Sequence, residues 1–198
     1  DKAARLLDEA GAKRNGGTRE LNGRPLKWVY QTTVNQVRQK TQEVIKASLQ
    51  KLNISVELKT IESSVFFSGD AGNTDTDSHF YADLEMYTNT PANLFPISWY
   101  QRYYSPEIAQ KENDWHGTNY LRYANPDFDK LFEQVRTEID PRQSTETFLQ
   151  MQRLIWQDVA EIAIVARKNV SAAGKELAGY TPSSWYGDTA DIADWRKG

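Results

Sequence analysis

Residues 26 to 59 read LKWVYQTTVNQVRQKTQEVIKASLQKLNISVELK, and this stretch decides the fold class. Leu26 to Gln31 predicts a strand. From about Val34 to Leu52 the apolar residues recur at helical spacing, and from Ile54 to Leu58 they alternate with polar ones, as in a half-buried strand. A strand, a helix and a second strand in this order normally close as a right-handed parallel crossover. The stretch therefore predicts an α/β fold. The residues expected on the inward face of the helix are Val37, Thr41, Val44, Ile45, Ala47 and Leu52.

Regular patterning continues on both sides of this unit. Ala4 to Ala10 predicts a short amphipathic helix that ends at Gly11. A short helical turn at Ser63 to Phe67 and a polar loop at Gly69 to Ser78 lead to Phe80 to Met86, where apolar and polar residues alternate again. We expect this last segment to form a third strand.

Two further helices are marked by their first residues. Asn125-Pro126-Asp127 combines an N-cap, a proline at the first helical position and an acid in the first turn, and Asp140-Pro141 repeats the device. Ile162 to Val165 predicts a last buried strand. The apolar faces expected on the two helices are Phe128, Leu131, Phe132 and Val135 on the first, and Phe148, Met151, Ile155 and Val159 on the second.

Composition excludes several classes of function. The 198 residues are 39% hydrophobic and 26% charged, which describes a soluble globular chain with a sizeable core. Its 24 basic and 27 acidic residues are scattered, so there is no basic stripe to follow a nucleic-acid backbone. No apolar run approaches the roughly 18 residues that a membrane span needs. The absence of cysteine excludes disulfides, thiol catalysis and cysteine-ligated zinc.

Three groups of polar residues suggest chemistry of their own. Asp83 and Glu85 could serve as the carboxylates of a glycoside hydrolase, although their alternation in a strand favours a solvated face. The segment 70 to 77 is rich in oxygen ligands but lacks the glycine and the terminal glutamate of an EF-hand loop. His79 and His116 are too far apart in sequence to form a local metal motif. We therefore expect no metal and no cofactor, and keep a carbohydrate-active hydrolase using Asp83 or Glu85 as the alternative function.

Five segments carry a resemblance to one family. They read KAARLLDEAG at residues 2 to 11, LQKLNISVEL at 49 to 58, RYANPDFDKL at 122 to 131, Asp140-Pro141-Arg142, and Met151 to Asp158. In this order they resemble the C-terminal part of the family 5 extracellular solute-binding proteins, the oligopeptide- and dipeptide-binding group. One departure is Asn53, which stands where the family usually has glycine.

The resemblance implies a type II periplasmic-binding-protein-like fold, in which two α/β lobes close on a solute. On this basis we expect residues 1 to 167 to be part of the C-terminal lobe and residues 168 to 198 to recross the hinge onto an N-terminal lobe outside this chain. The implied function is non-enzymatic capture of a small peptide-like or saccharide solute for the permease of an ABC importer. The implied location is periplasmic or extracellular. A third possibility is an isolated protein-interaction module.

In the relatives, strand ends and the loops beyond them face the solute, as is usual at the carboxyl ends of open α/β sheets. The matching ligand-binding candidates in this sequence are Tyr30, Gln31, Tyr87, Asn89, Thr90, Asn93, Trp99, Tyr100, Trp115 and Asn119. Arg122 is a further candidate, which could instead hold the helix that begins after Asn125.

The resemblance also makes a prediction about the solute. Peptide-binding members place an aspartate just beyond the third strand for the α-ammonium group, whereas Tyr87 to Pro91 contains no acid. Dipeptide members use an arginine near the end of the first strand for the ligand carboxylate, and this chain has Tyr30-Gln31 there. Because an unpaired buried charge is costly, we expect a solute without a free zwitterionic peptide backbone at this wall, such as a neutral polyol, an oligosaccharide or a blocked peptide.

Two expectations concern the chain on its own. Half a cleft offers only part of the contacts, so we expect this chain alone to bind solute weakly. The large aromatic residues Trp185, Tyr186 and Trp195 should lack their partner surface in this chain, so we expect the tail to pack poorly on its own lobe or to associate with a second copy.

Overall fold

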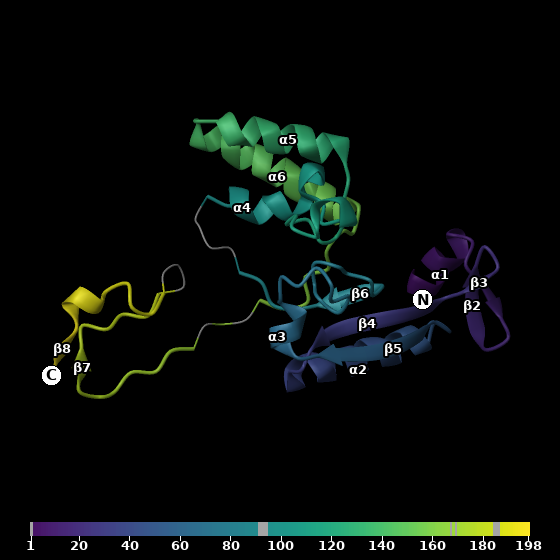
Figure 1. Ribbon diagram of the computed structural model, residues 1–198, viewed down its shortest axis with the longest axis horizontal. Coiled ribbons are helices and arrows are strands. Elements are labelled where there is room, and N and C mark those ends of the chain that lie inside the picture. The colour runs from purple at the N-terminus through teal and green to yellow at the C-terminus, as the bar shows by residue number, and fades with distance from the viewer. Residues whose placement is uncertain (1, 91–94, 167, 169, 184–186) are drawn as a thin grey trace.

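The computed structural model describes residues 2–90, 95–166, 168, 170–183 and 187–198 (Figure 1). Its strands are β1 (Lys13–Asn15), β2 (Thr18–Leu21), β3 (Arg24–Pro25), β4 (Lys27–Thr33), β5 (Ser55–Ile61), β6 (Leu84–Met86), β7 (Leu177–Ala178) and β8 (Arg196–Lys197). Its α-helices are α1 (Lys2–Glu9), α2 (Gln36–Gln50), α3 (Ser63–Phe66), α4 (Ile97–Tyr100), α5 (Pro126–Thr137) and α6 (Pro141–Gln157). Short 3-10 helices are η1 (Gln101–Tyr103), η2 (Ser105–Glu107), η3 (Lys111–Asn113) and η4 (Ile192–Asp194).

A parallel sheet of order β5-β4-β6 forms the centre of the first half of the chain. The helix α2 connects β4 to β5, which confirms the predicted strand, helix and strand and the parallel crossover. Asn35 begins α2 by accepting a hydrogen bond from the backbone N–H of Arg38. On the α2 side of the sheet, Tyr30, Ile54 and Val56 form a buried apolar core. We call this half the sheet body.

The predicted inward face of α2 is only partly right. Ile45 and Leu52 pack against the apolar core, but Val37 and Val44 are 73% and 66% exposed and Ala47 is not part of that core. The central inward position belongs to Gln42, whose side-chain amide donates to the backbone carbonyl of Tyr30 at 2.7 Å. A buried amide with this partner costs little, so the helix can turn a polar residue toward the sheet.

The third strand is shorter than predicted. Only Leu84 to Met86 pairs with β4, and at the start of the predicted segment Phe80 has a backbone φ of 40°, in the left-handed region that a strand does not use. Asp83 binds the residue before β6 to β4: its carboxylate accepts a hydrogen bond from the N–H of Val29 at 2.7 Å, and its own N–H donates to the carbonyl of Val29.

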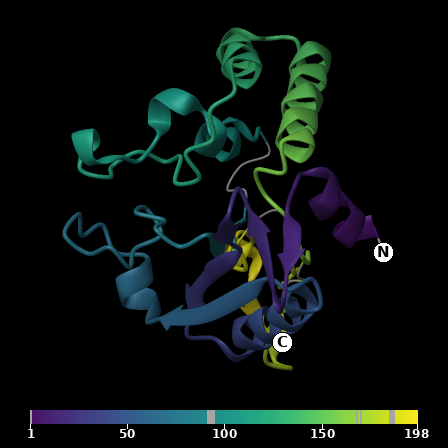
Figure 2. The same cartoon turned by 90° about the vertical axis from the view of Figure 1, so that its right-hand side faces the viewer.

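The helices α4, α5 and α6, with η1 to η3, form a second body above the sheet in Figures 1 and 2. Asn125 and Asp140 cap α5 and α6 as predicted, each followed by proline. Val159 is an exception among the predicted apolar residues: it lies past the end of α6, 61% exposed, with a φ of 52°. We call this part the helical body. Its core consists of Tyr103, Phe128, Phe132, Val135, Phe148, Met151 and Ile155.

The predicted strand at Ile162 to Val165 is wrong. Ile162, Ile164 and Val165 are 70%, 52% and 75% exposed, and no strand is formed there. Neither core includes a described residue beyond Ala160, so this apolar run has no sheet of its own chain to pack against.

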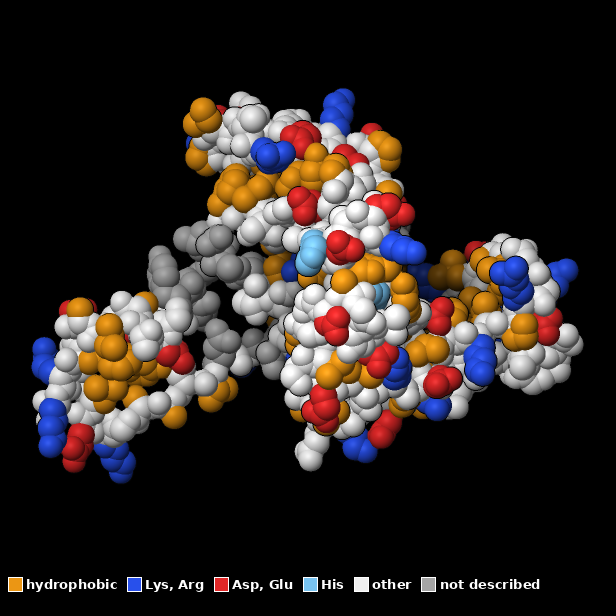
Figure 3. Space-filling model, viewed as in Figure 1, with side chains coloured by type: hydrophobic (Ala, Val, Ile, Leu, Met, Phe, Trp, Pro, Cys, Tyr) orange, Lys and Arg blue, Asp and Glu red, His pale blue; other side chains and the backbone are white. Residues whose placement is uncertain are grey.

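The segment that follows stands apart from both bodies in Figure 1. It is held by internal contacts: β7 pairs with β8, the indole N–H of Trp195 donates to Asp191 at 3.0 Å, and the Trp195 ring contacts Tyr180. Figure 3 shows apolar side chains gathered on the visible face of this tail. Trp185 and Tyr186 lie outside the described residues, so the expected exposure of all three aromatic residues stays a prediction.

Candidate functional site

The face of the sheet opposite α2 is polar. Lys59 on β5, Gln31 on β4 and Glu85 on β6 are in register and form a row across the three strands. The side-chain amide of Gln31 donates to Glu85 Oε1 and to the carbonyl of Asp75, each at 3.2 Å. Lys59 forms an ion pair with Asp75. The loop that contains Asp75 therefore covers this face and is bound to the middle of the sheet.

Glu85 does not lie on a solvated face, contrary to the sequence-based interpretation. Burial raises its pKa to about 9, the Asp77 carboxylate adds to the shift, and Arg122 and Lys59 oppose it. Burial also raises the pKa of Asp77 to about 6, against the effect of the backbone N–H of Ser78. At neutral pH the Glu85 carboxyl is protonated, so it carries no charge beneath the covering loop.

Arg122 ties this loop to the helical body. Its guanidinium donates to the backbone carbonyls of His79 and Phe80, while its Cζ lies 5.4 Å from the ring centroid of Trp115. Trp115 in turn lies on the buried ring of His79, with centroids 4.3 Å apart. The expectation that Arg122 holds the helix after Asn125 is therefore wrong, since its hydrogen bonds reach across to the other body.

Three large side chains of this contact have left-handed backbone conformations. The φ angles are 40° at Phe80, 62° at Trp115 and 53° at Arg122. Such angles are uncommon for residues with large side chains and persist only where the surroundings hold them. Here the arginine hydrogen bonds and the contact between the Trp115 and His79 rings do so, and they fix the helical body relative to the polar face of the sheet.

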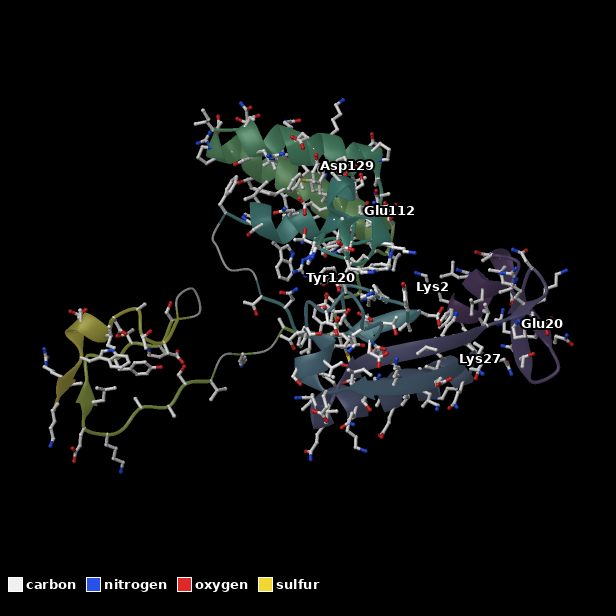
Figure 4. The ribbon with its side chains drawn as sticks, in the orientation of Figure 1. Lys2, Glu20, Lys27, Glu112, Tyr120 and Asp129 are labelled. Atoms are coloured by element: carbon white, nitrogen blue, oxygen red, sulfur yellow. The ribbon has the colours of Figure 1, made fainter. Side chains whose placement is uncertain are left out.

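A cluster of aromatic and charged residues lies where the two bodies meet, and we call it the junction: Tyr87, Trp99, Arg102 and Tyr120. Tyr120 lies between the helical body and β6 (Figure 4). The Cζ of Arg102 is 4.1 Å from the Trp99 ring centroid. Burial raises the pKa of both Tyr87 and Tyr120, Asp77 adds to the shift, and Arg102 opposes it. Arg102 therefore lies near both phenols, which keep their protons at neutral pH.

The candidates on the first strand are displaced from their predicted place. Because β4 runs to Thr33, Tyr30 and Gln31 lie inside the strand and are 4% and 3% exposed. Tyr30 belongs to the apolar core, where its hydroxyl lies 3.3 Å from the sulfur of Met86. Gln31 belongs to the polar row. Neither lies beyond the end of the strand, which was the reason for selecting them.

Two other candidates are integral to the helical body. Asn119 is fully buried, and its amide donates to the carbonyls of Tyr104 and Tyr123 while its oxygen accepts from the N–H of Tyr123. Tyr100 stacks on Phe148 with centroids 5.2 Å apart and packs against the helical core. These contacts account for both residues without a solute.

The candidates after β6 are more open. Tyr87 is half-buried, edge-on to Phe66 and Phe67, whereas Asn89 and Thr90 are exposed. Asn93 lies outside the described residues. Of the sequence-based candidates, the structure therefore brings Tyr87 and Trp99 to the junction and places Trp115 at the neighbouring loop contact.

Sequence reasoning missed Arg102, Tyr120 and Asp77. Arg102 had a visible signal, because it is the only charged residue in the run from Phe95 to Tyr104. Asp77 was hidden in a segment that resembled a calcium loop. In that segment Asp70 and Asn73 instead accept hydrogen bonds from the N–H groups of Gly72 and Asp75, which are local turn contacts.

Other classes of site find no support in the part of the chain that the structure describes. No group of three or more His, Asp or Glu side chains there could hold a metal ion. None of the described helices is both long and apolar enough to span a membrane. Two open hollows lie away from the junction, one in the tail near Gly179 and Asp191 and one beside Asn22 and Arg24.

Comparison with known proteins gives a consistent family. Residues 1–111 match the family model described as bacterial extracellular solute-binding proteins, family 5 Middle. The oligopeptide-binding protein AppA of Bacillus subtilis is 27% identical over 183 residues, covering 90% of this chain and 31% of AppA. The chain thus spans about a third of the length of that relative.

Solved structures show the same fold. The Bacillus subtilis AppA structure, in complex with a nonapeptide, matches all of this chain and 37% of its own, with a TM-score of 0.69 and 22% identity. An oligopeptide-binding protein from Thermus thermophilus, complexed with a pentapeptide, matches 80% of this chain and 28% of its own, with a TM-score of 0.68 and 25% identity. NikZ from Campylobacter jejuni, in complex with Ni(L-His), reaches a TM-score of 0.73 at 14% identity, over 99% of this chain and 38% of its own.

Proposed function

We propose, from the premise that this chain belongs to the bacterial extracellular solute-binding proteins of family 5, that the full-length protein captures a small solute for an ABC-type importer. The junction is the observation that carries this proposal. It combines half-buried aromatic side chains, two protonated phenols and one arginine where two bodies of the chain meet. Binding sites for small molecules commonly have this make-up of aromatic walls with a few oriented polar groups.

In this proposal the chain supplies one wall of the site. The rest of the protein supplies the opposite wall, and closure of the two buries the solute. Residues 168 to 198 cross back to that other part, which would cover the exposed apolar run at Ile162 to Val165 and the aromatic side chains of the tail. The same surfaces give a route to self-association when the chain is separated from its partner.

The proposed role is binding without catalysis. The matching relatives carry names of binding proteins. The carboxylates that suggested a hydrolase have other partners: Asp83 accepts from the backbone of Val29, and Glu85 accepts from Gln31. The protein would act at the cell envelope, in the periplasm or outside the membrane, and pass its solute to a permease.

The solute class is part of the proposal. The AppA and Thermus thermophilus structures hold peptides, which supports a peptide-like solute. Thr88, Asn89 and Thr90 offer no charge for a peptide α-ammonium group, and Asp77 is only 8% exposed. We therefore infer a solute that presents no ammonium group to this wall, such as an N-blocked peptide or a saccharide.

Calorimetric titration of the full-length protein with oligopeptides, their N-acetylated forms and oligosaccharides tests this function. We expect binding in one of these classes without turnover, and at least tenfold weaker binding in Trp99→Ala. Trp156→Ala is the matched control, because Trp156 is 66% exposed on α6 and is not a residue of the junction. The isolated chain of residues 1 to 198 should bind the same solute far more weakly.

Several outcomes would contradict the proposal. Equal affinities of the two tryptophan variants would place the solute elsewhere. Hydrolysis of a bound saccharide, abolished by Asp83→Asn, would establish the alternative enzyme. Affinity for a free peptide that falls on N-acetylation would refute the inferred solute class while leaving solute capture intact.

A further inference from the structure

We propose that Arg102 is a carboxylate-binding residue, which makes the junction selective for solutes that carry an acidic group. This inference rests on the proposed function and names the chemistry of its solute. It concerns a residue on η1, outside the strand ends where charge partners were sought.

The position of Arg102 is unusual for a cation. One face of its guanidinium lies over Trp99, with Cζ 4.1 Å from the ring centroid, and the side chain is half-buried. Its Nε is buried and has no hydrogen-bond partner among the described residues. A buried N–H without an acceptor is costly, and an arginine left without a countercharge adds to that cost.

The other cations nearby already have partners. Lys59 is paired with Asp75, and Arg122 donates to two backbone carbonyls of the covering loop. Arg102 forms no ion pair within the described part of the chain. Arg38, at the strand ends, donates to the hydroxyls of Thr33 and Thr88, so among the described cations of this region Arg102 remains available to a solute.

The nearby acidic side chains have other hydrogen-bond partners than Arg102. Glu85 is protonated at neutral pH and is bound to Gln31. Asp77 is 8% exposed and interacts with the backbone N–H of Ser78. Glu161 accepts a hydrogen bond from the hydroxyl of Tyr103. Each of these carboxyl groups thus has another hydrogen-bond partner, and none of them forms an ion pair with Arg102 in the described part of the chain.

A solute carboxylate fits this arrangement. A guanidinium stacked on a ring by its face still presents its N–H groups along its edge, where a carboxylate binds with two parallel hydrogen bonds. The phenols of Tyr87 and Tyr120 keep their protons at neutral pH, because burial raises the pKa of each, so they do not compete with the solute as anions. This charge is compatible with the segment Thr88 to Thr90, which contains no acid, since the solute needs a carboxylate but no ammonium group.

The test uses the full-length protein and two matched pairs of probes in calorimetric titrations. One pair is N-acetyl-pentaalanine as the free acid and as its C-terminal amide, and the other is cellobionate and cellobiose. We expect the wild type to bind one acid at least tenfold more tightly than its neutral partner. Arg102→Gln should remove this preference, and Arg102→Lys should keep part of it. Arg153→Gln is the control, because Arg153 is exposed on α6.

Each outcome decides the inference. Equal binding of acid and neutral partner by the wild type, or a preference that survives in Arg102→Gln, would overturn it. If the wild type and Arg102→Gln bind the neutral probes equally and neither binds the acids more tightly, the inference is overturned but solute capture is still supported. If none of the four probes binds, the result counts against both. If Arg102→Gln does not fold, as judged by circular dichroism, the acid and neutral comparison on the wild type and Arg102→Lys still decides.

Discussion

The two faces of the central sheet differ in kind, although the same three strands make both. Toward α2, Tyr30, Ile54 and Val56 are buried among apolar neighbours, as in an ordinary core. On the opposite face, Gln31 and Glu85 are bound to each other beneath a loop that also holds Asp77. The first face stabilises the fold through burial of apolar area, whereas the second uses hydrogen bonds to hold the loop and the helical body beside the junction.

The largest expected effect is on the apolar face. Ile54 is 2% exposed, so Ile54→Ala should lower the free energy of unfolding by about 2–5 kcal/mol, through lost burial and the cavity left behind. Urea unfolding measures this change. Glu57→Ala, at an exposed position of β5 three residues along the chain, should stay within about 0.5 kcal/mol of the wild type. Equal losses in the two variants would show that the segment from Ile54 through β5 does not have one buried face.

The polar face of the sheet should make the free energy of unfolding depend on pH. The folded-state pKa of Glu85 is about 9, above its ordinary value of 4.5, so the folded state keeps a proton that the unfolded state loses. Its contribution to stability is complete below pH 4.5 and is lost as pH rises toward 9, by up to about 1.4 kcal/mol per pH unit.

The matching variant is Glu85→Gln, which keeps the shape and cannot ionise. Between pH 7 and 9 it should lose less stability than the wild type, so the difference between their urea midpoints should grow with pH. Parallel profiles of the two proteins would mean that Glu85 is solvated, as the sequence alone indicated.

A smaller effect is expected in the helical body, at Asn119. Asn119→Ala removes two donated hydrogen bonds and one accepted hydrogen bond and should lower the free energy of unfolding by about 1–3 kcal/mol. Solute affinity of the folded variant should stay within about twofold, a change of less than about 0.5 kcal/mol. Thr118→Ala, at the exposed neighbouring position, is the stability control. A variant that folds normally but loses solute affinity would show that Asn119 is a ligand-binding residue, as the sequence predicted.

The smallest effect is expected on the outer face of α2. Val44 is 66% exposed, and Val44→Ser should change the free energy of unfolding by no more than about 0.5 kcal/mol. Ile45→Ser, one position along and packed on the sheet, should cost clearly more in the same chemical-unfolding series. A larger loss in Val44→Ser than in Ile45→Ser would show that Val44 lies on the inward face of α2, as the sequence predicted.

These contrasts also show what the sequence could determine. The strand, helix and strand of residues 26 to 59 and the caps at Asn125 and Asp140 depend on neighbours in the chain, so periodicity and residue type suffice to predict them. The orientation of α2 depends on Gln42 finding the carbonyl of Tyr30, which lies on another element. Sequence periodicity favoured the valines instead, because it counts apolar residues and cannot detect a distant acceptor.

The candidate site was predictable to a similar extent. Tyr87 directly follows β6, and Trp99 lies in the helical stretch that the sequence places next, so both could be named in advance. Arg102 and Tyr120 reach the junction only because Arg122 and Trp115 hold the helical body against the loop at His79. That contact joins segments about 40 residues apart through left-handed backbone conformations, which local patterns do not predict.

The central claim is that the junction forms one wall of a solute site. Hydrogen–deuterium exchange on the full-length protein, with and without the tightest-binding probe of the titrations, tests it most directly. We predict that the solute slows exchange in residues 95 to 104 and 116 to 122, and leaves α2 from Val37 to Val44 unchanged. Protection confined to α2 or to other segments, with the junction exchanging at its original rate, would contradict the account.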